Sequence, residues 1–504
     1  MIYAVLWLAL LLFTLSVKHV GVVPRVRWAV TELRGAVQVL RSESYGDEAK
    51  EAMIQKSALG MVGALASITG RSVLALAIPL VFVALGAFLG LYSREAVLEV
   101  ASDATFVAVT SAAMLLLWFL IPSPVEPRVA SADQRRGQEI DRYNSVDRAL
   151  HQVAFRSLGA QKALADLESR VYAPRLAAIE LQRPVFVSSL PRAGTTLLLE
   201  VLSNAPDFAV ATYRSMPFAL CPLLWDRVSR GLRKPGELRE RAHGDGMVVS
   251  YDSPEAFEEV VWKSGWEARY QADRLRPWGP ADRDPDFEVY LQDYMRKVVA
   301  LSGRPGARYL SKNNANIARL TLLPRLFPDS RIVVPVRNPY PHAASLAQQH
   351  ARFLEIHAQD RFARSYMEWL GHYEFGAALR PIDFNGWLDE PDRPSPAMPE
   401  FWLRYWLAAY SALASQAGDQ VLFVDYEALC ANPSGQLRAL GENLGLAEPS
   451  ALATQGSRFR APPAPPAPDP SLDLELRRSL SALHTDLTER AIGGVGRVSS
   501  AFGR

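Results

Sequence analysis

The sequence predicts an α/β domain with a mostly parallel sheet flanked by helices, preceded by about three transmembrane helices. Between residues 183 and 460, short apolar segments typical of buried strands alternate with helical segments. Strands that alternate with helices are joined by right-handed crossovers, which gives a parallel sheet covered on both faces. Three long apolar runs fall within the first 121 residues, and none as long follows.

The composition is that of a folded protein. Of the 504 residues, 49% are hydrophobic and 21% are charged. The formal net charge of +2 provides no overall field that would attract nucleic acid. Cys221 and Cys430 lie far apart, so they form neither a metal-ligand pattern nor a disulfide framework. We therefore expect no metal and no nucleic-acid partner.

The three apolar runs cover residues 2–17, about 73–92 and about 104–121. Each is close to the roughly 20 residues that cross about 30 Å of hydrocarbon. Lys18 follows the first run, whereas a cleaved signal peptide carries its positive charge before the apolar run. We therefore expect residues 1–122 to form a membrane anchor. The alternative is that these runs are buried helices of a soluble protein.

The basic residues around the runs predict the orientation. They follow the first run, precede the second and follow the third: Lys18, Arg25, Arg27, Arg34, Arg41, Arg71, Arg128, Arg135, Arg136 and Arg142. Because basic flanks stay in the cytoplasm, the N-terminus is expected outside and the chain after Pro122 inside. This predicts a multi-pass protein of the cytoplasmic (inner) membrane, with the lipid bilayer as a partner. Residues 20–70 are either a surface-lying amphipathic helix or a solvated connector.

The remainder divides into three regions. Residues 123–182 are a predicted helical connector, 183–460 the α/β domain, and 461–504 a proline-rich connector with a C-terminal helix. Strands are predicted at residues 184–189, 331–336 and 421–425, and a turn and a helix follow each of the first two. The aromatic-rich helix 402–413 is expected to belong to the core.

The first turn, residues 189–196, reads Ser-Leu-Pro-Arg-Ala-Gly-Thr-Thr. Backbone N–H groups at such a strand–turn–helix junction bind anionic oxygens. Gly194 allows close approach, Arg192 adds a positive charge, and Thr195 and Thr196 add hydroxyl donors. The spacing is P-loop-like, but Thr195 stands where a Walker lysine would bind the β and γ phosphates. The turn therefore predicts phosphate binding and is poorly suited to ATP or GTP.

A second constellation, residues 337–345, reads Arg-Asn-Pro-Tyr-Pro-His-Ala-Ala-Ser and also follows a predicted strand. Arg337 offers a bidentate donor to an oxyanion, and Ser345 offers a neutral hydroxyl. Between the two turns, the segment Tyr-Leu-Ser-Lys-Asn-Asn at 309–314 leads into Leu-Phe-Pro at 326–328.

Together these segments resemble the sulfotransferases that use 3′-phosphoadenylyl sulfate (PAPS), whose donor loop reads Pro-Arg/Lys-Ser/Ala-Gly-Thr-Thr. The resemblance covers about residues 183–450 and is closest to a bacterial branch that also resembles tyrosylprotein sulfotransferases. It implies transfer of a sulfuryl group from the co-substrate PAPS to a hydroxyl, with release of adenosine 3′,5′-bisphosphate and without a metal. A membrane anchor favours a lipid or glycan acceptor, and a small molecule stays open.

The resemblance also implies roles for individual residues. The donor's 5′-phosphosulfate is assigned to one continuous segment: Arg192, Ala193, Gly194, Thr195, Thr196 and Leu197. Arg337 and Ser345 are assigned to the 3′-phosphate, and Arg458 to a basic loop that contacts the donor. Lys312 resembles the lysine of a family Lys-x-Pro segment, and with Arg192 it would neutralise charge on the leaving group.

The general base is less well defined. Many relatives carry a glutamate about twenty residues after the donor loop, but residues 211–217 here contain no carboxylate. His243, in the turn Arg-Ala-His-Gly-Asp-Gly, is the first candidate, with Asp245 able to orient its ring. That turn is alternatively a loop capped by its own aspartate. Glu258 is the second candidate, although glutamates early in a helix commonly complement its dipole.

Two other functions are open. A P-loop kinase or other phosphoryl-transfer enzyme would require ATP and magnesium, and the missing Walker lysine counts against it. A membrane scaffold with a degenerate nucleotide fold would tolerate loss of Arg192 or Arg337. The two motifs at the family spacing count against that alternative.

Overall fold

The computed structural model describes residues 2–20, 47–103, 106, 110, 114, 145–229, 238–240, 248–250, 253–460 and 472–493. The chain divides into two compact units. The first is Met1–Arg136 with Arg227–Arg233, and the second is Gly137–Asp226 with Lys234–Arg504.

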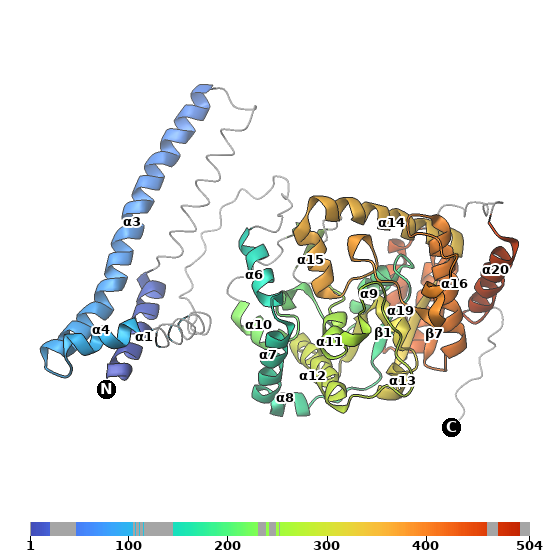
Figure 1. Ribbon diagram of the computed structural model, residues 1–504, viewed down its shortest axis with the longest axis horizontal. Coiled ribbons are helices and arrows are strands. Elements are labelled where there is room, and N and C mark those ends of the chain that lie inside the picture. The colour runs from blue at the N-terminus through green and yellow to red at the C-terminus, as the bar shows by residue number, and fades with distance from the viewer. Residues whose placement is uncertain are drawn as a thin grey trace. The chain divides into compact units, whose positions relative to one another are not determined.

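The first unit is helical. Helix α1 (Ile2–Val20) packs against the long helix α3 (Asp47–Phe88) and against α4 (Arg94–Ser102), and α3 is prominent in Figure 1. Within α3, Ser67–Phe88 is the one stretch of the described residues that is long and apolar enough to cross a membrane, and little of it is buried. Val5–Val17 is a shorter apolar helix. The predicted third run, 104–121, lies almost wholly outside the described residues. The three predicted transmembrane helices therefore stay a prediction.

The second unit is built on a five-stranded parallel sheet with strand order β2-β5-β1-β6-β7. The strands are β1 (Val185–Val187), β2 (Phe208–Val210), β5 (Arg308–Lys312), β6 (Arg331–Val336) and β7 (Val421–Asp425). This confirms the predicted parallel sheet, and β1, β6 and β7 are the three strands expected from the sequence. Val187 pairs with Lys312 on one side and with Val333 on the other, so the carboxyl ends of β1 and β5 meet.

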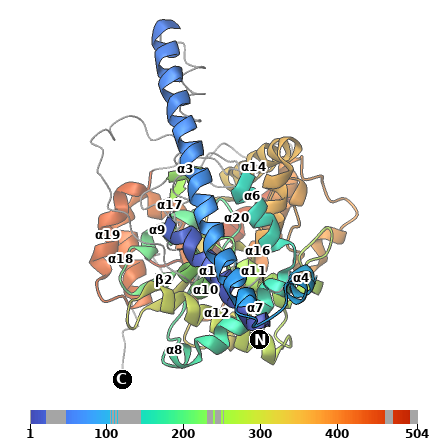
Figure 2. The ribbon, with the colours of Figure 1, turned by 90° about the vertical axis from the view of Figure 1, so that its left-hand side faces the viewer.

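Helices cover both faces of the sheet because alternate strand residues face opposite sides. Val185 and Val187 pack with helices α9 (Thr195–Ser203), α17 (Tyr426–Ala431) and α18 (Pro433–Leu444). Phe186, between them in the chain, packs with α12 (Pro285–Ser302), α14 (Pro339–Gln359) and α16 (Pro399–Gln416). In Figure 2, α9, α17 and α18 lie on one side of the second unit, and α14 and α16 lie on the other. Trp406 of α16 is fully buried, as expected of a core helix.

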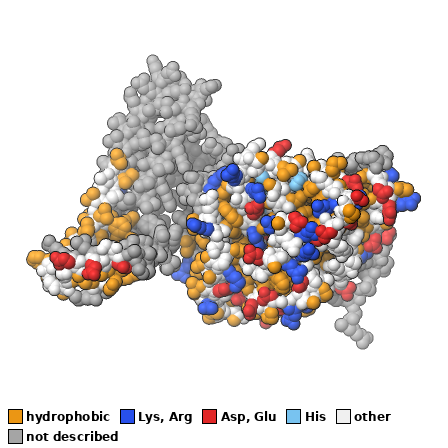
Figure 3. Space-filling model, viewed as in Figure 1, with side chains coloured by type: hydrophobic (Ala, Val, Ile, Leu, Met, Phe, Trp, Pro, Cys, Tyr) orange, Lys and Arg blue, Asp and Glu red, His pale blue; other side chains and the backbone are white. Residues whose placement is uncertain are grey.

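The remaining elements surround this three-layer arrangement. They are α6 (Ser145–Phe155), α7 (Leu158–Val171), α8 (Ala173–Ala177), α10 (Pro222–Ser229), the antiparallel pair β3 (Leu238–Glu240) and β4 (Val248–Ser250), α11 (Glu258–Gly265), α13 (Leu323–Leu326), α15 (Arg361–Leu370), α19 (Pro449–Ala453) and α20 (Leu474–Glu489). Basic and acidic side chains alternate over the face of the second unit shown in Figure 3. That mixture agrees with the small net charge of +2.

Candidate active site

The turn after β1 is fixed at its base by two serines. Ser188 Oγ donates to the carbonyl of Asn313 at 2.7 Å, and Ser189 Oγ donates to the carbonyl of Pro335 at 2.8 Å. These bonds join the turn to the chain after β5 and to β6. The turn therefore starts from a rigid edge at the carboxyl ends of three neighbouring strands.

The turn itself requires a glycine. Gly194 precedes α9 with a φ of 88°, a left-handed conformation that favours glycine. A Cβ at this position would come within 2.8 Å of the Tyr426 ring. The close neighbour of Gly194 is an aromatic ring from α17, and the predicted approach of an anion to this glycine stays a prediction. Arg192 is also left-handed, with a φ of 71°.

The two predicted anion-binding motifs are in direct contact. Arg192 Nε donates to Ser345 Oγ at 3.2 Å, and Arg337 Nη1 donates to the main-chain carbonyl of Arg192 at 2.9 Å. The Arg337 guanidinium lies 5.2 Å from the centre of the Tyr426 ring. Its Nε is buried and has no hydrogen-bond partner among the described residues. The site therefore concentrates cationic and hydroxyl donors, which suits a ligand with more than one anionic group.

His342, in the second motif, ties the two motifs together. Its Nε2 lies 2.8 Å from the carbonyl of Pro191 in the first turn. Burial lowers the pKa of His342 to about 3, so the ring is neutral and its Nε2–H donates to that carbonyl. His342 therefore helps to hold the turn at residues 189–196, which we call the phosphate turn, against the second motif.

The low pKa of His342 predicts that stability falls in mild acid. Between about pH 6.5 and 3, the unfolded histidine binds a proton that the folded one does not. The free energy of unfolding should therefore fall with decreasing pH by up to about 1.4 kcal/mol per pH unit. Urea denaturation at pH 7.5 and 5.5 checks this: His342→Gln, which keeps an N–H donor, should lose about 1.4 kcal/mol less than the wild type. Equal losses in both proteins would contradict the assignment.

A cleft of about 970 Å³ opens beside the phosphate turn, and its lining includes Arg192, Thr195, Thr196, Glu255, Lys312, His372 and Glu374. We call it the main cleft. Lys312 lines it from the end of β5, and its role at the leaving group stays a prediction. Thr195 Oγ1 donates to Asn314 Oδ1 at 3.3 Å, and Asn314 Nδ2 donates to Glu374 Oε1 at 3.0 Å. Asn314 thus links the phosphate turn to a carboxylate across the cleft.

The other residues assigned to the donor do not all line the main cleft. Ala193 is buried, Thr196 lines the main cleft, and Leu197 packs against the helical layer instead of lining the cleft. Arg458 forms an ion pair with Glu200, which lines the cleft. Arg458 is therefore at the border of the cleft and is held by a carboxylate.

Glu258, the second candidate for the base, is not in the main cleft. It is buried and accepts hydrogen bonds from Trp262 Nε1 at 3.0 Å, Tyr309 OH at 2.9 Å and Asn316 Nδ2 at 2.7 Å. A carboxylate with both oxygens occupied inside the core cannot reach an acceptor hydroxyl, so Glu258 is withdrawn as a candidate. His243, the first candidate, lies outside the described residues.

Two carboxylates that line the main cleft were not assigned from the sequence. Glu255 accepts a hydrogen bond from Tyr213 OH and another from Ala256 N at 2.8 Å. Glu374 accepts one from Asn314, and no donor among the described residues reaches its Oε2. Glu374 lies in a glycine-bracketed turn, Gly-His-Tyr-Glu-Phe-Gly at 371–376. A glycine-bracketed polar turn was also the reason for proposing His243, so the sequence carried a comparable signal for Glu374.

A buried ion pair fixes the chain that carries Lys312. Arg319 donates to both oxygens of Glu259, at 2.8 and 2.9 Å, and Glu259 Oε2 also accepts from Asn313 Nδ2 at 2.7 Å. Burial raises the pKa of Glu259, but the Arg319 charge and these hydrogen bonds bring it below its usual range. Since Asn313 follows Lys312 directly, this network positions the lysine.

The family of the chain follows from a comparison of its sequence with protein families. The model of the sulfotransferase family matches residues 184–450, just over half of the chain. A sulfotransferase from Mycobacterium avium is 15% identical, with 66% of this chain and 82% of that chain covered and a TM-score of 0.39. One from Mycobacterium tuberculosis is 17% identical, with 66% and 85% covered and a TM-score of 0.37. No curated protein sequence matches. On the family match, the chain belongs to the sulfotransferase family and is a sulfotransferase.

Proposed function

We propose that the chain transfers the sulfuryl group of PAPS to a hydroxyl of an acceptor and releases adenosine 3′,5′-bisphosphate. The observation that carries this proposal is the contact between the two motifs, in which Arg192 reaches Ser345 and Arg337 reaches the Arg192 carbonyl. PAPS carries anionic groups on both the 5′ and 3′ sides of one ribose. Two neighbouring anion sites suit such a donor, with Arg192, Thr195 and Thr196 at the 5′ end and Arg337 and Ser345 at the 3′ end.

The proposed chemistry is an in-line displacement at sulfur. PAPS supplies an activated sulfuryl group when bound. The acceptor oxygen forms the new bond to sulfur, the bond from sulfur to the 5′-phosphate oxygen breaks, and the acceptor proton goes to a base. Lys312 and Arg192 stabilise the charge that develops on the departing oxygen, and fixed cations in a preformed cleft are effective in this role. The scheme requires no metal.

We assign the base to Glu374. It lines the main cleft together with Lys312, and Asn314 holds its Oε1, which leaves Oε2 directed to no donor among the described residues. Glu255 is the less suitable carboxylate, because Tyr213 and Ala256 already donate to it. His243 stays a prediction outside the described residues.

We also propose that the chain is anchored in the cytoplasmic (inner) membrane, with the catalytic unit on the cytoplasmic side. The exposed apolar stretch Ser67–Phe88 and the basic residues that flank the apolar runs support this. The site then has access to hydroxyls of lipids, glycans or small molecules.

The donor assignment is tested by pairing a variant with two ligands. Arg337→Ala should weaken binding of adenosine 3′,5′-bisphosphate by about 1.5–3 kcal/mol for each charge-assisted hydrogen bond lost. The same variant should lose less affinity for adenosine 5′-phosphosulfate, because that ligand lacks the 3′-phosphate and only the support of Arg337 for the Arg192 carbonyl is removed. Calorimetry on the full-length protein in detergent measures both.

The matched control is Arg438→Ala, an exposed arginine on α18. It should leave both affinities unchanged. Equal weakening of the two ligands by Arg337→Ala would show that Arg337 does not contact the 3′-phosphate and would overturn the proposed arrangement.

A further inference from the structure

A second space opens beside the main cleft and shares part of its wall. We call it the side pocket, and it is partly open to solvent. Five residues line both spaces: Pro191, Lys312, Asn314, His372 and Glu374. A molecule in the side pocket therefore reaches Lys312 and Glu374, which the proposed reaction uses.

Away from this shared wall, the side pocket is largely apolar. Its apolar lining includes Leu190, Leu275, Ile317, Leu379, Ile382 and Trp402. Leu190, Ile317 and Trp402 are each at most 1% exposed, so the pocket is formed by core side chains rather than by a surface depression. Burial of apolar surface is therefore the main binding contribution that this wall offers.

Backbone hydrogen bonds hold the wall in place. Leu275 N donates to the carbonyl of Pro381 at 2.9 Å, and Asp383 N donates to the carbonyl of Leu275 at 2.9 Å. Ile382 N donates to Tyr405 OH at 3.1 Å, which fixes the position of a tyrosine that lines the pocket. The pocket is thus preformed, which lowers the entropic cost of binding.

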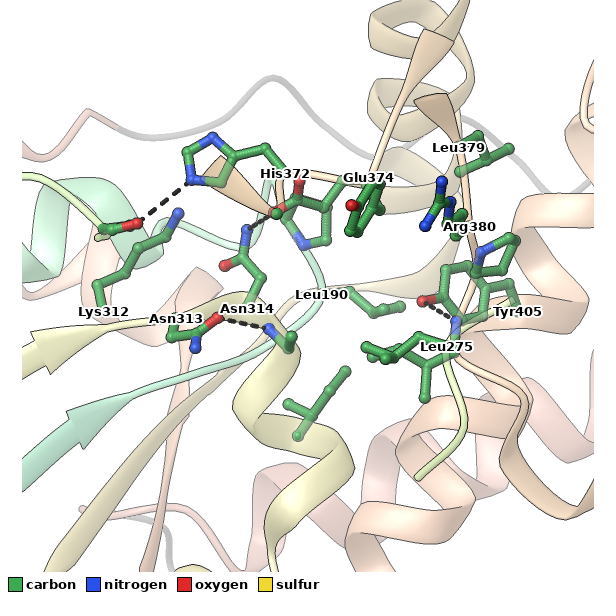
Figure 4. Close-up of a pocket in the computed structure, with 18 of the residues that line it drawn as sticks. Leu190, Leu275, Lys312, Asn313, Asn314, His372, Glu374, Leu379, Arg380 and Tyr405 are labelled. Carbon is green, nitrogen blue, oxygen red and sulfur yellow. Dashed lines mark hydrogen bonds between the residues drawn. The ribbon is translucent and has the colours of Figure 1, made fainter. Parts of the chain in front are cut away.

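Most of the polar groups lie at one end, and Arg380 lies at the other end beside Leu379 (Figure 4). In Figure 4, Lys312, Asn314 and His372 lie at one end of the side pocket, and Leu275, Leu379 and Tyr405 lie at the other. A hydroxyl at the polar end can donate to Glu374 Oε2 while the group that carries it contacts the apolar wall. Because apolar side chains predominate in the lining, it suits a molecule with one reactive hydroxyl and a largely apolar remainder.

We propose that the side pocket binds the acceptor, and that the acceptor is an alcohol whose hydroxyl is carried on a compact apolar body. This inference rests on the proposed sulfuryl transfer, in which the alcohol proton goes to Glu374 as its oxygen bonds to sulfur. A sugar in the same place would bring several hydroxyls against carbon-lined walls, where they would lose their hydrogen bonds to water. The lining therefore selects against glycans.

An acceptor series tests the inference. Full-length protein in detergent is supplied with radiolabelled PAPS and with cyclohexylmethanol, methyl glucoside or hexadecanol. We expect kcat/KM for cyclohexylmethanol to exceed that for the other two by at least about tenfold. Preference for methyl glucoside would assign a glycan acceptor, and preference for hexadecanol a long-chain lipid. Either result would overturn the inference.

Filling the pocket provides the second test. Leu379 lines the side pocket but not the main cleft, whereas Leu354 on α14 is 43% exposed. Leu379→Trp should raise KM for cyclohexylmethanol by at least about tenfold, and Leu354→Trp should leave it unchanged. Both variants should keep wild-type affinity for adenosine 3′,5′-bisphosphate, which shows that they are folded. An unchanged KM in a folded Leu379→Trp would contradict the inference.

If Leu379→Trp fails to bind the bisphosphate, Leu379→Ala takes its place. The wider pocket should then raise kcat/KM for adamantylmethanol relative to cyclohexylmethanol, and an unchanged ratio would overturn the inference.

The proposed function and the acceptor inference are contradicted by different results. A wild-type protein that does not bind the bisphosphate contradicts the proposed function. One that binds it and does not sulfate cyclohexylmethanol contradicts the acceptor inference alone.

Discussion

Glu374→Gln should lower kcat by about 10²–10⁴-fold, the usual loss when a general base is removed, and leave the affinity for adenosine 3′,5′-bisphosphate unchanged. The glutamine keeps the size of the side chain and an oxygen that can accept from Asn314 Nδ2, which now donates to Glu374 Oε1 at 3.0 Å. It cannot take a proton from the acceptor. Turnover with any acceptor that the wild type sulfates, together with calorimetry of the bisphosphate, measures the two effects separately.

Glu255→Gln is the matched control, because it is the same change at another carboxylate of the main cleft. Glu255 already accepts hydrogen bonds from Tyr213 and Ala256, so its loss should affect turnover less. A larger loss in Glu255→Gln than in Glu374→Gln would move the base to Glu255. Full activity in both variants would favour His243 as the base.

Glu259→Gln should destabilise the second unit by about 3–5 kcal/mol, because it leaves the Arg319 charge buried without its counter-ion. The Arg319 guanidinium lies 4.3 Å from the Trp262 ring centre and 4.1 Å from that of Trp278, so water cannot replace the lost carboxylate. Burial raises the pKa of Glu259, but Arg319 brings it below its usual range. The stabilisation is therefore present above the unfolded pKa and is lost as the pH falls through the folded one.

Urea denaturation at neutral pH measures this change. The control is Glu368→Gln, which removes an exposed ion pair between Glu368 and Arg364 at 2.9 Å on α15. Exposed pairs of this kind contribute about 0–1 kcal/mol. A loss in Glu259→Gln no larger than in Glu368→Gln would show that the buried network does not hold the unit together.

The fold was largely predictable where strand, turn and helix follow one another with clear apolar patterns. Strands β1, β6 and β7 were expected for that reason. Strand β2 has only three residues, and β5 carries Arg308, Ser311 and Lys312 among its five. Neither offers a run that a sequence pattern distinguishes from a loop, so their places beside β1 depend on tertiary packing.

The two motifs that the proposal assigns to the donor were recognisable from the sequence because each follows a predicted strand with its own local pattern. Arg192, Arg337, Ser345 and Lys312 were all named, and the structure brings the first three into contact. Glu374, the proposed base, was not predictable in the same way. It reaches the cleft because α15 ends at Leu370 and the following turn is joined to Asn314, just after β5.

For the glutamates at the start of α11, the sequence suggested roles that the structure does not support. Their position predicted either a base or a complement to the helix dipole. Glu258 and Glu259 are instead buried partners of Asn316 and Arg319, which lie about sixty residues further along the chain. No local pattern reports a partner at that separation.

The central claim is that the main cleft, together with the neighbouring Arg337 and Ser345, binds a nucleotide with both 3′ and 5′ phosphates. Calorimetry on the full-length protein in detergent, with adenosine 3′,5′-bisphosphate and ATP–magnesium compared side by side, tests it most directly. We predict micromolar binding of the bisphosphate and much weaker binding of ATP–magnesium, because Thr195 replaces the Walker lysine and already donates to Asn314. Preference for ATP–magnesium would indicate phosphoryl transfer, and binding of neither ligand by folded protein would indicate a scaffold. Both results would contradict the account.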